Sequence, residues 1–279
     1  MSLYDSSGMM LFSDCELAKR LESAEGHACA QFARAHGRLF PDSGAESIRH
    51  AGAYVVFDGI DSPVTQSFGL GILGELSPAS LDVIERFFFE RRAHADHEVS
   101  PLAGVGVLRL LCEREYEPVE ISSVLYRPVE RVAVTERGKI RVRIAGPPDE
   151  ELWADINTRA WTHEHPELRD FIRQTATISL AREHTTCFLA EIDDRAGAAG
   201  TLCLHEGVAL FAGAATVPEL RRQGLQRALF EERLRYAFDQ GCDLAMVVTE
   251  AGGDSQRNAE RAGFRIAYTR TKWRLPHCG

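Results

Sequence analysis

At 279 residues, the chain has room for one large or two ordinary domains. Hydrophobic residues at 44% and charged residues at 26% are typical of a soluble globular protein, and no apolar run reaches the roughly 18 residues of a membrane span. A net charge of −9 argues against a protein that binds nucleic acid through its phosphates. The first five residues show no secretion signal, so we expect a cytoplasmic protein.

The first half predicts helices where apolar residues recur at three- and four-residue spacing, and strands where β-branched and aromatic residues form short runs. The expected helices cover residues 11–40, 80–93 and 105–115, and the expected strands cover residues 53–57, 65–73, 98–99 and 119–126. Gly26 is the place where the first helix would break. Residues 130–139 carry mixed charge and suit a short connection between two halves.

The second half predicts the order strand, helix, helix, three strands, helix, strand, helix, strand. The expected strands cover residues 140–144, 186–192, 199–205, 208–216, 244–248 and 266–273, and the expected helices cover residues 150–160, 167–180, 225–240 and 255–263. Asp149 is the expected N-cap of the first of these helices. The pattern indicates a mixed sheet flanked by helices.

The stretch from Gly213 to Gln240 has the clearest chemical use. A short apolar strand leads through Pro218 into a basic corner, residues 221–226, and then into an amphipathic helix whose charged residues, Arg233 among them, are expected on its outer side. The first N–H groups of such a helix have no partner within it, and Gly224 lets a ligand approach them closely. The preferred occupant is a phosphate or pyrophosphate.

This corner reads R-x-x-G-x-[GA], with Gln226 in the last place, and it resembles the pyrophosphate loop of the GNAT superfamily of acetyl-CoA-dependent N-acetyltransferases. Residues 216–220 precede the loop as in that family. Residues 255–264 then resemble its second motif, a helix that ends in Gly-Phe and leads into a strand. The resemblance covers about residues 140–275 and implies an α/β fold with acetyl-CoA as co-substrate.

The resemblance also implies which residues contact acetyl-CoA. The backbone near Thr216 and Val217 would bind the pantetheine arm, and Ser255 and Asn258 would reach it from the opposite wall. The pyrophosphate would be held by the loop residues Arg221, Arg222, Gln223, Gly224, Leu225, Gln226 and Arg227. The amine would attack the thioester directly, with both substrates held in one cleft.

The reaction needs a base for the ammonium proton and an acid for the thiolate. Glu250, at the end of a strand, is our candidate base, acting directly or through water. The tyrosine that many family members use as acid would fall at Ala259, so Tyr268 on the next strand is the candidate substitute, with a packing role as the alternative. The residues His163, Glu164 and His165 offer too few ligands for a zinc site, and seven scattered cysteines indicate reduced thiols.

The element order of the second half also occurs in the first. Placing Glu115 on Gly263, an offset of 148 residues, superimposes the third expected helix and the strand after it on their second-half counterparts. At the position of the basic corner, the first half has residues 74–79, which carry Glu75 and Pro78 instead of arginines. We therefore expect a degenerate domain without cofactor over residues 1–130 and an active domain over residues 131–279.

The sequence does not specify the acceptor, although the acidic balance favours a small amine over nucleic acid. A non-catalytic acyl-CoA sensor or scaffold is the main alternative, since the usual tyrosine is missing and one half is degenerate. A nucleotide-binding protein is a weaker alternative because the chain has no G-x-x-x-x-G-K-[ST] loop. A homodimer stays open.

Overall fold

The computed structural model describes residues 12–131, 138–161, 167 and 169–277. Its first half runs through α1 (Cys15–Leu39), β1 (Glu46–His50), β2 (Ala53–Phe57), β3 (Gln66–Phe68), α2 (Pro78–Phe89), β4 (Ala95–Val99), α3 (Val105–Glu113) and β5 (Glu117–Pro128). These bounds follow the predicted elements, with β1 as an additional strand. The expected strand over residues 65–73 is shorter, because the chain turns after Phe68, where Ile72 and Leu73 donate to the carbonyl of Gly69.

The second half has the predicted order of elements. It consists of β6 (Ile140–Ile144), α4 (Glu150–Trp161), α5 (Arg169–Leu180), β7 (Thr185–Ile192), β8 (Arg195–His205), β9 (Val208–Thr216), α6 (Leu225–Asp239), β10 (Leu244–Glu250), α7 (Asp254–Arg261) and β11 (Arg265–Leu275). No helix within the described residues is both long enough and apolar enough to cross a membrane.

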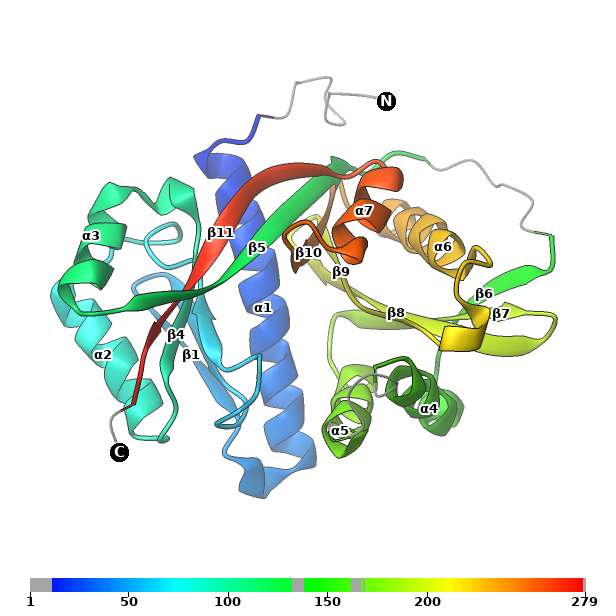
Figure 1. Ribbon diagram of the computed structural model, residues 1–279, viewed down its shortest axis with the longest axis horizontal. Coiled ribbons are helices and arrows are strands. Elements are labelled where there is room, and N and C mark those ends of the chain that lie inside the picture. The colour runs from blue at the N-terminus through cyan, green and yellow to red at the C-terminus, as the bar shows by residue number, and fades with distance from the viewer. Residues whose placement is uncertain (1–11, 132–137, 162–166, 168, 278–279) are drawn as a thin grey trace.

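Helix α1 does not break at Gly26, contrary to the sequence prediction. A Cβ at this position would lie 2.4 Å from Cδ2 of Tyr54, so the missing side chain lets the aromatic ring pack directly on the helix backbone. The helix contacts β1, β2 and β3 on one side and β8 and β9 on the other (Figure 1). Helix α1 therefore fills the space between the two halves.

All the described strands join one sheet, in the order β1-β2-β3-β4-β11-β5-β10-β9-β8-β7-β6. Strand β5, from the first half, pairs antiparallel with β10, and β11, from the second half, pairs antiparallel with β4. The last strand of each half thus completes the part of the sheet built by the other half. The division of the chain near residue 130 stays a prediction, but the two halves share a sheet and the helix α1.

The structure carries the repeat that the sequence suggested. An offset of 148 residues places Glu113, the last residue of α3, on Arg261, the last residue of α7, and it places the first residues of β5 and β11 on each other. At the turn between helix and strand, Glu115 and Gly263 both have left-handed backbone, with φ of 62° and 86°. The two copies therefore end in the same helix–turn–strand unit.

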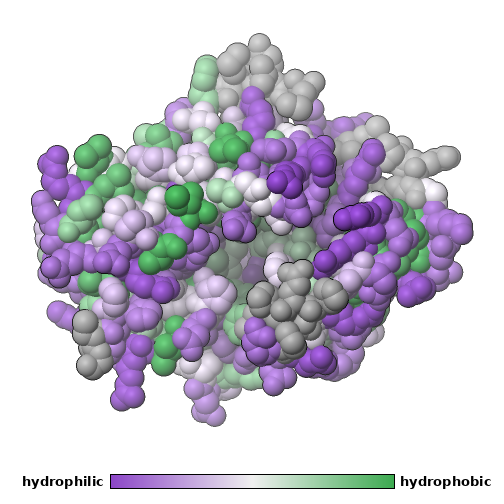
Figure 2. Space-filling model, in the orientation of Figure 1, coloured by the Kyte–Doolittle hydropathy of each residue, from purple (hydrophilic) through white to green (hydrophobic). Residues whose placement is uncertain are grey.

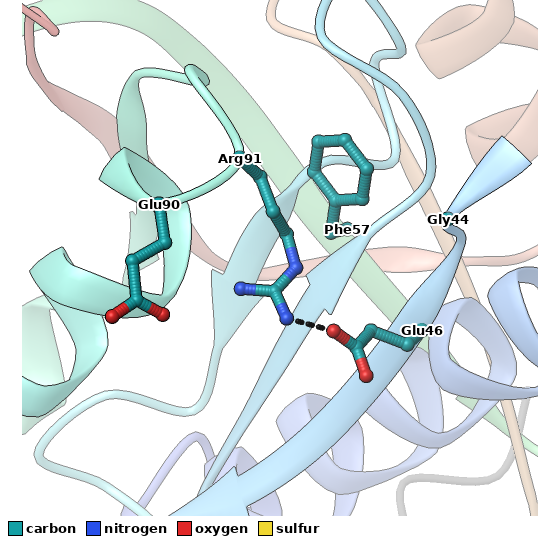
Figure 3. A pocket seen from close by; sticks show the side chains of 5 residues that line it. All are labelled: Gly44, Glu46, Phe57, Glu90 and Arg91. Atoms are coloured by element: carbon teal, nitrogen blue, oxygen red, sulfur yellow. Dashed lines mark hydrogen bonds and ion pairs between the residues drawn. The ribbon is translucent and has the colours of Figure 1, made fainter.

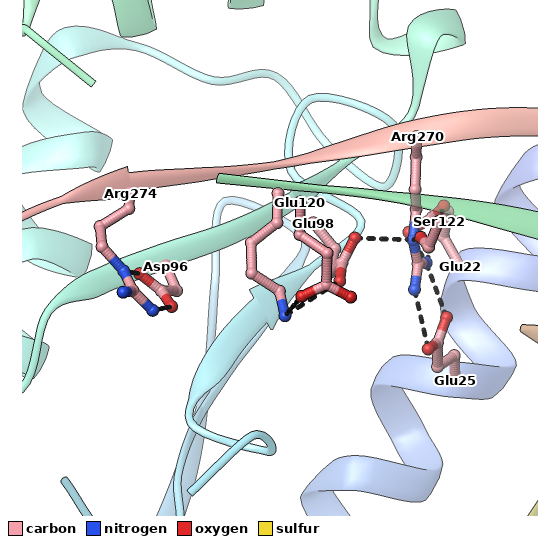
Figure 4. Close-up of polar contacts among 9 residues, drawn as sticks. Glu22, Glu25, Asp96, Glu98, Glu120, Ser122, Arg270 and Arg274 are labelled. Atoms are coloured by element: carbon pink, nitrogen blue, oxygen red, sulfur yellow. Dashed lines mark hydrogen bonds and ion pairs between the residues drawn. The ribbon is translucent and has the colours of Figure 1, made fainter. Parts of the chain in front are cut away.

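A buried ionic cluster lies where α1, β4, β5 and β11 meet (Figure 4). The Arg270 side chain is 1% exposed and forms ion pairs with Glu22, Glu25 and Glu98, at 3.3, 2.6 and 2.9 Å. Its Nε also donates to the hydroxyl of Ser122 at 3.2 Å. Burial opposes the charge of Arg270, but the three carboxylates outweigh it and hold its pKa well above the ordinary value. One guanidinium therefore ties the C-terminal strand to helix α1 and to both neighbouring strands.

Candidate functional site

The sheet opens between β9 and β10, which are parallel neighbours near its centre. They pair only from Leu244 opposite Val208 to Val247 opposite Phe211, although β9 continues to Thr216 and β10 to Glu250. On the other side of β9, one residue of β8, Gly200, stands opposite two residues of β9, Gly213 and Ala214, which is a β-bulge. Gly213 and Ala214 are exposed there, and Gly213 has φ of 56°. Beyond Phe211 and Val247 the two strands are no longer paired with each other, and the place between their unpaired ends is called the gap below.

Helix α6 begins beside this gap. A short 3-10 helix over Pro218–Leu220 leads to Arg222 and Gly224, whose left-handed φ angles are 63° and 90°. Gly224 is the N-cap, and it provides no side-chain hydrogen bond to the first helical turn. The N-terminal N–H groups and the positive end of the dipole of this 15-residue helix therefore face an exposed corner, as the sequence predicted.

The basic side chains of this corner have different roles. Arg221 uses its guanidinium within the protein, where Nη2 donates to the Ala160 carbonyl at 3.2 Å and Nε donates to the Thr216 carbonyl at 3.3 Å. It therefore braces the end of β9 against the end of α4. Arg222 is exposed, and Arg227, also exposed, donates to Glu231 one helical turn further on.

The remaining loop residues are held locally. Gln223 donates to the Glu219 carbonyl at 3.2 Å, and Gln226 donates to the Thr216 hydroxyl at 2.6 Å, so the first turn of α6 is fixed to the end of β9. Leu225 is buried beneath the turn. Val217 is buried as well, and its N–H and C=O bond to Gly197 and Leu220. A contact between acetyl-CoA and Val217 stays a prediction, and the exposed bulge residues nearby offer a more accessible backbone.

The opposite wall of the gap is formed by β10 and α7. Glu250 is exposed at the end of β10, and its backbone carbonyl accepts from the Gly253 amide at 3.3 Å. Ser255 and Asn258 are exposed on α7, and the Asn258 side chain accepts from Arg261 at 3.4 Å. Glu250, Ser255 and Asn258 thus lie on consecutive elements, at the end of β10 and on α7, and their contact with acetyl-CoA stays a prediction.

Tyr268 lies further away along the sheet, because β5 separates its strand from β10. Its hydroxyl is buried and donates to Oε1 of Glu22 at 3.0 Å. Burial, together with the charge of Glu22, raises the pKa of Tyr268 well above its ordinary value. Ala259, where the resemblance would place a tyrosine, lies on α7 itself and is fully buried. The structure therefore does not bring Tyr268 together with the other predicted residues.

Arg233 on α6 is fully buried, contrary to the prediction that it lies on the outer face of the helix. Its guanidinium packs 4.7 Å from the ring centre of Phe211, and its Nη1 donates to the Thr201 carbonyl at 3.1 Å. The close approach depends on Gly200, where a Cβ would lie 3.1 Å from the guanidinium carbon. Arg233 therefore fixes α6 to β8 and β9. Helical periodicity could not show this, because an arginine ordinarily faces solvent.

Sequence reasoning also left Gly213 and Ala214 out of the site. A signal for them was present, since a glycine inside a predicted strand indicates a bulge or a close backbone approach. The cluster at residues 163–165 lies outside the described residues. Within the described part of the chain, no group of three or more His, Cys, Asp and Glu side chains is arranged to hold a metal ion.

The corresponding corner of the first half is closed. Ser77 caps α2 with its own hydroxyl, which accepts from the Ser80 amide at 3.1 Å. Gly74 packs so tightly on the preceding turn that a Cβ would lie 2.5 Å from the Ala51 carbonyl oxygen. Leu70 and Ile72 are buried in the loop after β3, the strand that corresponds to β9. The first half therefore lacks both the open helix end and the arginines of the second half.

Figure 2 shows a hollow near the centre of this face, and in Figure 1 this place lies below β10, between α1 and the strands β8 and β9. Two other cavities lie away from the β9–β10 gap. One, of about 430 Å³, lies in the first half and contains the ion pair between Arg91 and Glu46 (Figure 3). The other, of about 370 Å³, lies between the first half and α5. The gap is defined by the end of the β9–β10 pairing and by the start of α6, and neither cavity is lined by residues of these segments.

Comparison with known proteins gives a consistent result. A family model described as acetyltransferase (GNAT) family matches residues 150–264. The structure is similar to a GCN5-related N-acetyltransferase from Kribbella flavida, with a TM-score of 0.65 and 19% identity, covering 93% of this chain and 96% of that one. No curated protein matches the chain.

Two further solved structures are also similar. A GCN5-related N-acetyltransferase from Sphaerobacter thermophilus has a TM-score of 0.53 and 15% identity, covering 96% of this chain and 93% of that one. A tandem GNAT protein from the clavulanic acid biosynthesis pathway has a TM-score of 0.56 and 13% identity, covering 81% of this chain and 79% of that one. At these identities the likeness concerns the fold. The predicted mixed α/β fold of tandem type is confirmed.

Proposed function

We propose that the protein transfers an acetyl group from acetyl-CoA to a primary amine of a small molecule, because residues 150–264 match the family model described as acetyltransferase (GNAT) family. The observation that carries the proposal is the open N-terminus of α6 beside the separated ends of β9 and β10. A helix end with free N–H groups suits a diphosphate, and a gap between two strands offers backbone groups to an extended arm.

In this proposal, the helix end and the exposed arginines bind the diphosphate of acetyl-CoA. The N–H groups at the start of α6 supply directional hydrogen bonds, and Arg222 and Arg227 add positive charge. Arg221, Gln226 and Arg233 keep the helix in place against β8, β9 and α4. The pantetheine arm would then run between β9 and β10, with Ser255 and Asn258 on the far wall.

The chemical step forms one bond and breaks another. The neutral amine attacks the thioester carbonyl, the C–N bond forms and the C–S bond breaks. The proton that the nitrogen loses ends on the departing thiolate, which leaves as the thiol. Glu250, exposed at the end of β10, would accept the ammonium proton, directly or through water. Holding both reactants in one cleft supplies much of the acceleration.

Tyr268 is the sequence candidate for the acid, and its geometry supports a packing role instead. Its hydroxyl donates to buried Glu22, and it would have to break that bond to reach a thiolate. The missing tyrosine at Ala259 also motivates a second function, in which the protein binds acyl-CoA without catalysis. Thiol release across a panel of small amines distinguishes the two, because a sensor binds acetyl-CoA and releases no thiol.

We propose further that one acetyl-CoA binds per chain, at the second half. The support is the contrast between Gly224, which leaves its helix end open, and Ser77, which caps its own helix. Isothermal titration calorimetry measures the stoichiometry directly. A value of two per chain would contradict the assignment of a closed first half.

Charge removal tests the diphosphate site itself. Arg222→Asn removes an exposed charge and keeps a residue that tolerates left-handed backbone, so the fold is retained. Arg235→Asn is the matched control, because Arg235 lies on the same helix, away from its N-terminus, and pairs with Glu232. We expect acetyl-CoA affinity to fall about tenfold in the first variant only, as for the loss of one charge-assisted contact. Equal affinities in the two variants would remove the corner from the site.

A further inference from the structure

The cavity of about 370 Å³ lies at the junction of the two halves. It is lined by the C-terminal part of α1, by the turn after β2 and by α5. The lining residues are His36, Ser43, Asp58, Gly59, Asp61, Ser62, Phe171, Gln174, Thr175 and Ile178. None of these residues belongs to the acetyl-CoA cleft proposed above. The volume lies within the usual range for small-molecule sites.

A buried polar chain forms the inner wall of this cavity. Nδ1 of His36 lies 2.7 Å from Oδ1 of Asp58, and the two side chains are 9% and 4% exposed. The hydroxyl of Ser62 donates to Oδ2 of the same carboxylate at 2.6 Å. Nε2 of Gln174, on α5, lies 3.3 Å from Nε2 of His36. The chain thus runs from the first half to a helix of the second.

These contacts hold Asp58 in the wall as a hydrogen-bonded carboxylate. The ring nitrogen Nδ1 of His36 and the hydroxyl of Ser62 both bond to it, and the amide nitrogen of Gln174 lies within hydrogen-bond distance of the other ring nitrogen of His36. Burial raises the pKa of Asp58, against the hydrogen bonds from Ser62 and His36, so a cation beside this carboxylate would relieve an unfavourable environment.

The other lining residues also favour a cationic ligand. Asp61 adds a second carboxylate at the rim, and the described residues that line the cavity include neither lysine nor arginine. Ser43, Ser62 and Thr175 offer hydroxyl groups. Phe171, which is 38% exposed, and Ile178 offer an apolar flank on α5, where an aromatic face also attracts a cation.

The other cavity provides a contrast within the same protein. Its lining contains two carboxylates, those of Glu46 and Glu90, but also Arg91, which pairs with Glu46 and packs over the ring of Phe87 at 4.0 Å. A cationic ligand would have to displace that arginine (Figure 3). In the cavity at Asp58 the partner of the carboxylate is a histidine, His36, and the described lining residues include no lysine or arginine that a ligand would have to displace.

We propose that the cavity between α1, the turn at residues 58–62 and α5 binds a small organic cation, with an ammonium group at Asp58 and an apolar part against Phe171. The site is independent of acetyl-CoA binding. It lies on both halves of the chain, so the ligand would bridge α5 to the first half.

The test uses the full chain and three probes of equal shape, which are benzylammonium, benzyl alcohol and benzoate, each titrated by calorimetry. We expect only benzylammonium to bind, with one site per chain. Asp58→Asn should weaken its binding at least tenfold, as expected for loss of a buried charge partner. Glu46→Gln, in the other cavity, is the matched control and should leave the affinity unchanged.

A second variant, Thr175→Phe, fills the cavity from the surface of α5 and leaves the buried pair intact. If Asp58→Asn does not fold, Thr175→Phe tests the proposal in its place. This variant should abolish the binding of benzylammonium. The proposal is overturned if benzylammonium does not bind at about 10 mM, if benzyl alcohol binds equally well, or if Thr175→Phe binds like the unaltered protein. Acetyl-CoA is titrated into the same samples. Its binding tests the transferase proposal separately, because the two sites share no residue.

Discussion

Replacing Arg270 by methionine tests the feature that joins the two halves. Methionine keeps most of the length of the side chain and removes the charge. Arg270 is the shared partner of Glu22, Glu25 and Glu98, whose side chains are 0%, 13% and 5% exposed. Lys272, 3.7 Å from Glu98, remains as a cation at the edge of the cluster, where it also pairs with Glu120 at 2.6 Å.

The magnitude follows from burial. Removing one partner of a buried ion pair costs about 3–5 kcal/mol, because the other charge stays buried and uncompensated. Here one substitution affects three carboxylates, so we expect a loss at the upper end, about 5 kcal/mol. This is a large share of the roughly 5–15 kcal/mol that stabilises a typical protein. At about 2–4 °C per kcal/mol for a unit of 150–250 residues, Tm should fall by about 10–20 °C.

The loss should depend on pH, with a defined sign. Burial already raises the pKa of Glu22 and Glu98, and Arg270 opposes that rise. Without Arg270 their folded-state pKa values rise further above the unfolded values. A group with a raised folded pKa contributes stability below its unfolded pKa and loses it as pH increases. The deficit of Arg270→Met should therefore be largest near pH 8 and shrink toward pH 5.

The assay is thermal and urea unfolding, followed by circular dichroism, across this pH range. Arg274→Met is the control, because Arg274 lies on the same strand and pairs with Asp96 at 2.7 Å but is 40% exposed. A partly exposed pair of this kind is worth about 0–1 kcal/mol. If the two variants lost equal stability, or if the deficit at Arg270 were the same at pH 5 and pH 8, the reasoning would be refuted.

Three further predictions concern catalysis and the division of the chain. Glu250→Gln should lower kcat by about 100-fold or more with unchanged acetyl-CoA affinity, and an unaltered pH–rate profile would exclude Glu250 as the base. Tyr268→Phe removes the hydroxyl that donates to buried Glu22, so the free energy of unfolding should fall by about 1–3 kcal/mol while kcat is retained. A large fall in kcat without loss of stability would instead favour Tyr268 as a catalytic acid. Residues 138–279 expressed alone should not form a stable monomer. Without the first half, β10 loses its partner β5, and Leu244 and Met246 lose their apolar contacts with α1. A monomeric peak in size-exclusion chromatography together with cooperative urea unfolding would contradict this prediction.

Much of the candidate site could be read from the sequence because it is local. The strand β9, the turn at Pro218, the glycine at 224 and the helix α6 are consecutive, so motif, spacing and periodicity describe one continuous structure. The unpaired N–H groups at the start of the helix belong to its own first turn, so no distant residue is needed to provide them. The same holds for the repeat, since an offset of 148 residues matches helix–turn–strand units that are each local.

The sequence alone therefore determined the element order, the mixed α/β fold and the open helix end at Gly224. Only the tertiary structure decided how the halves combine. Periodicity shows that one face of a strand is apolar, but it does not show which strand lies beside it, and so it could not show that β5 pairs with β10 and β11 with β4. Burial is likewise a property of the whole molecule. In the sequence Arg270 and Arg233 look like surface arginines, but α1 covers the first, and the rings of Phe211 and Phe230 cover the second.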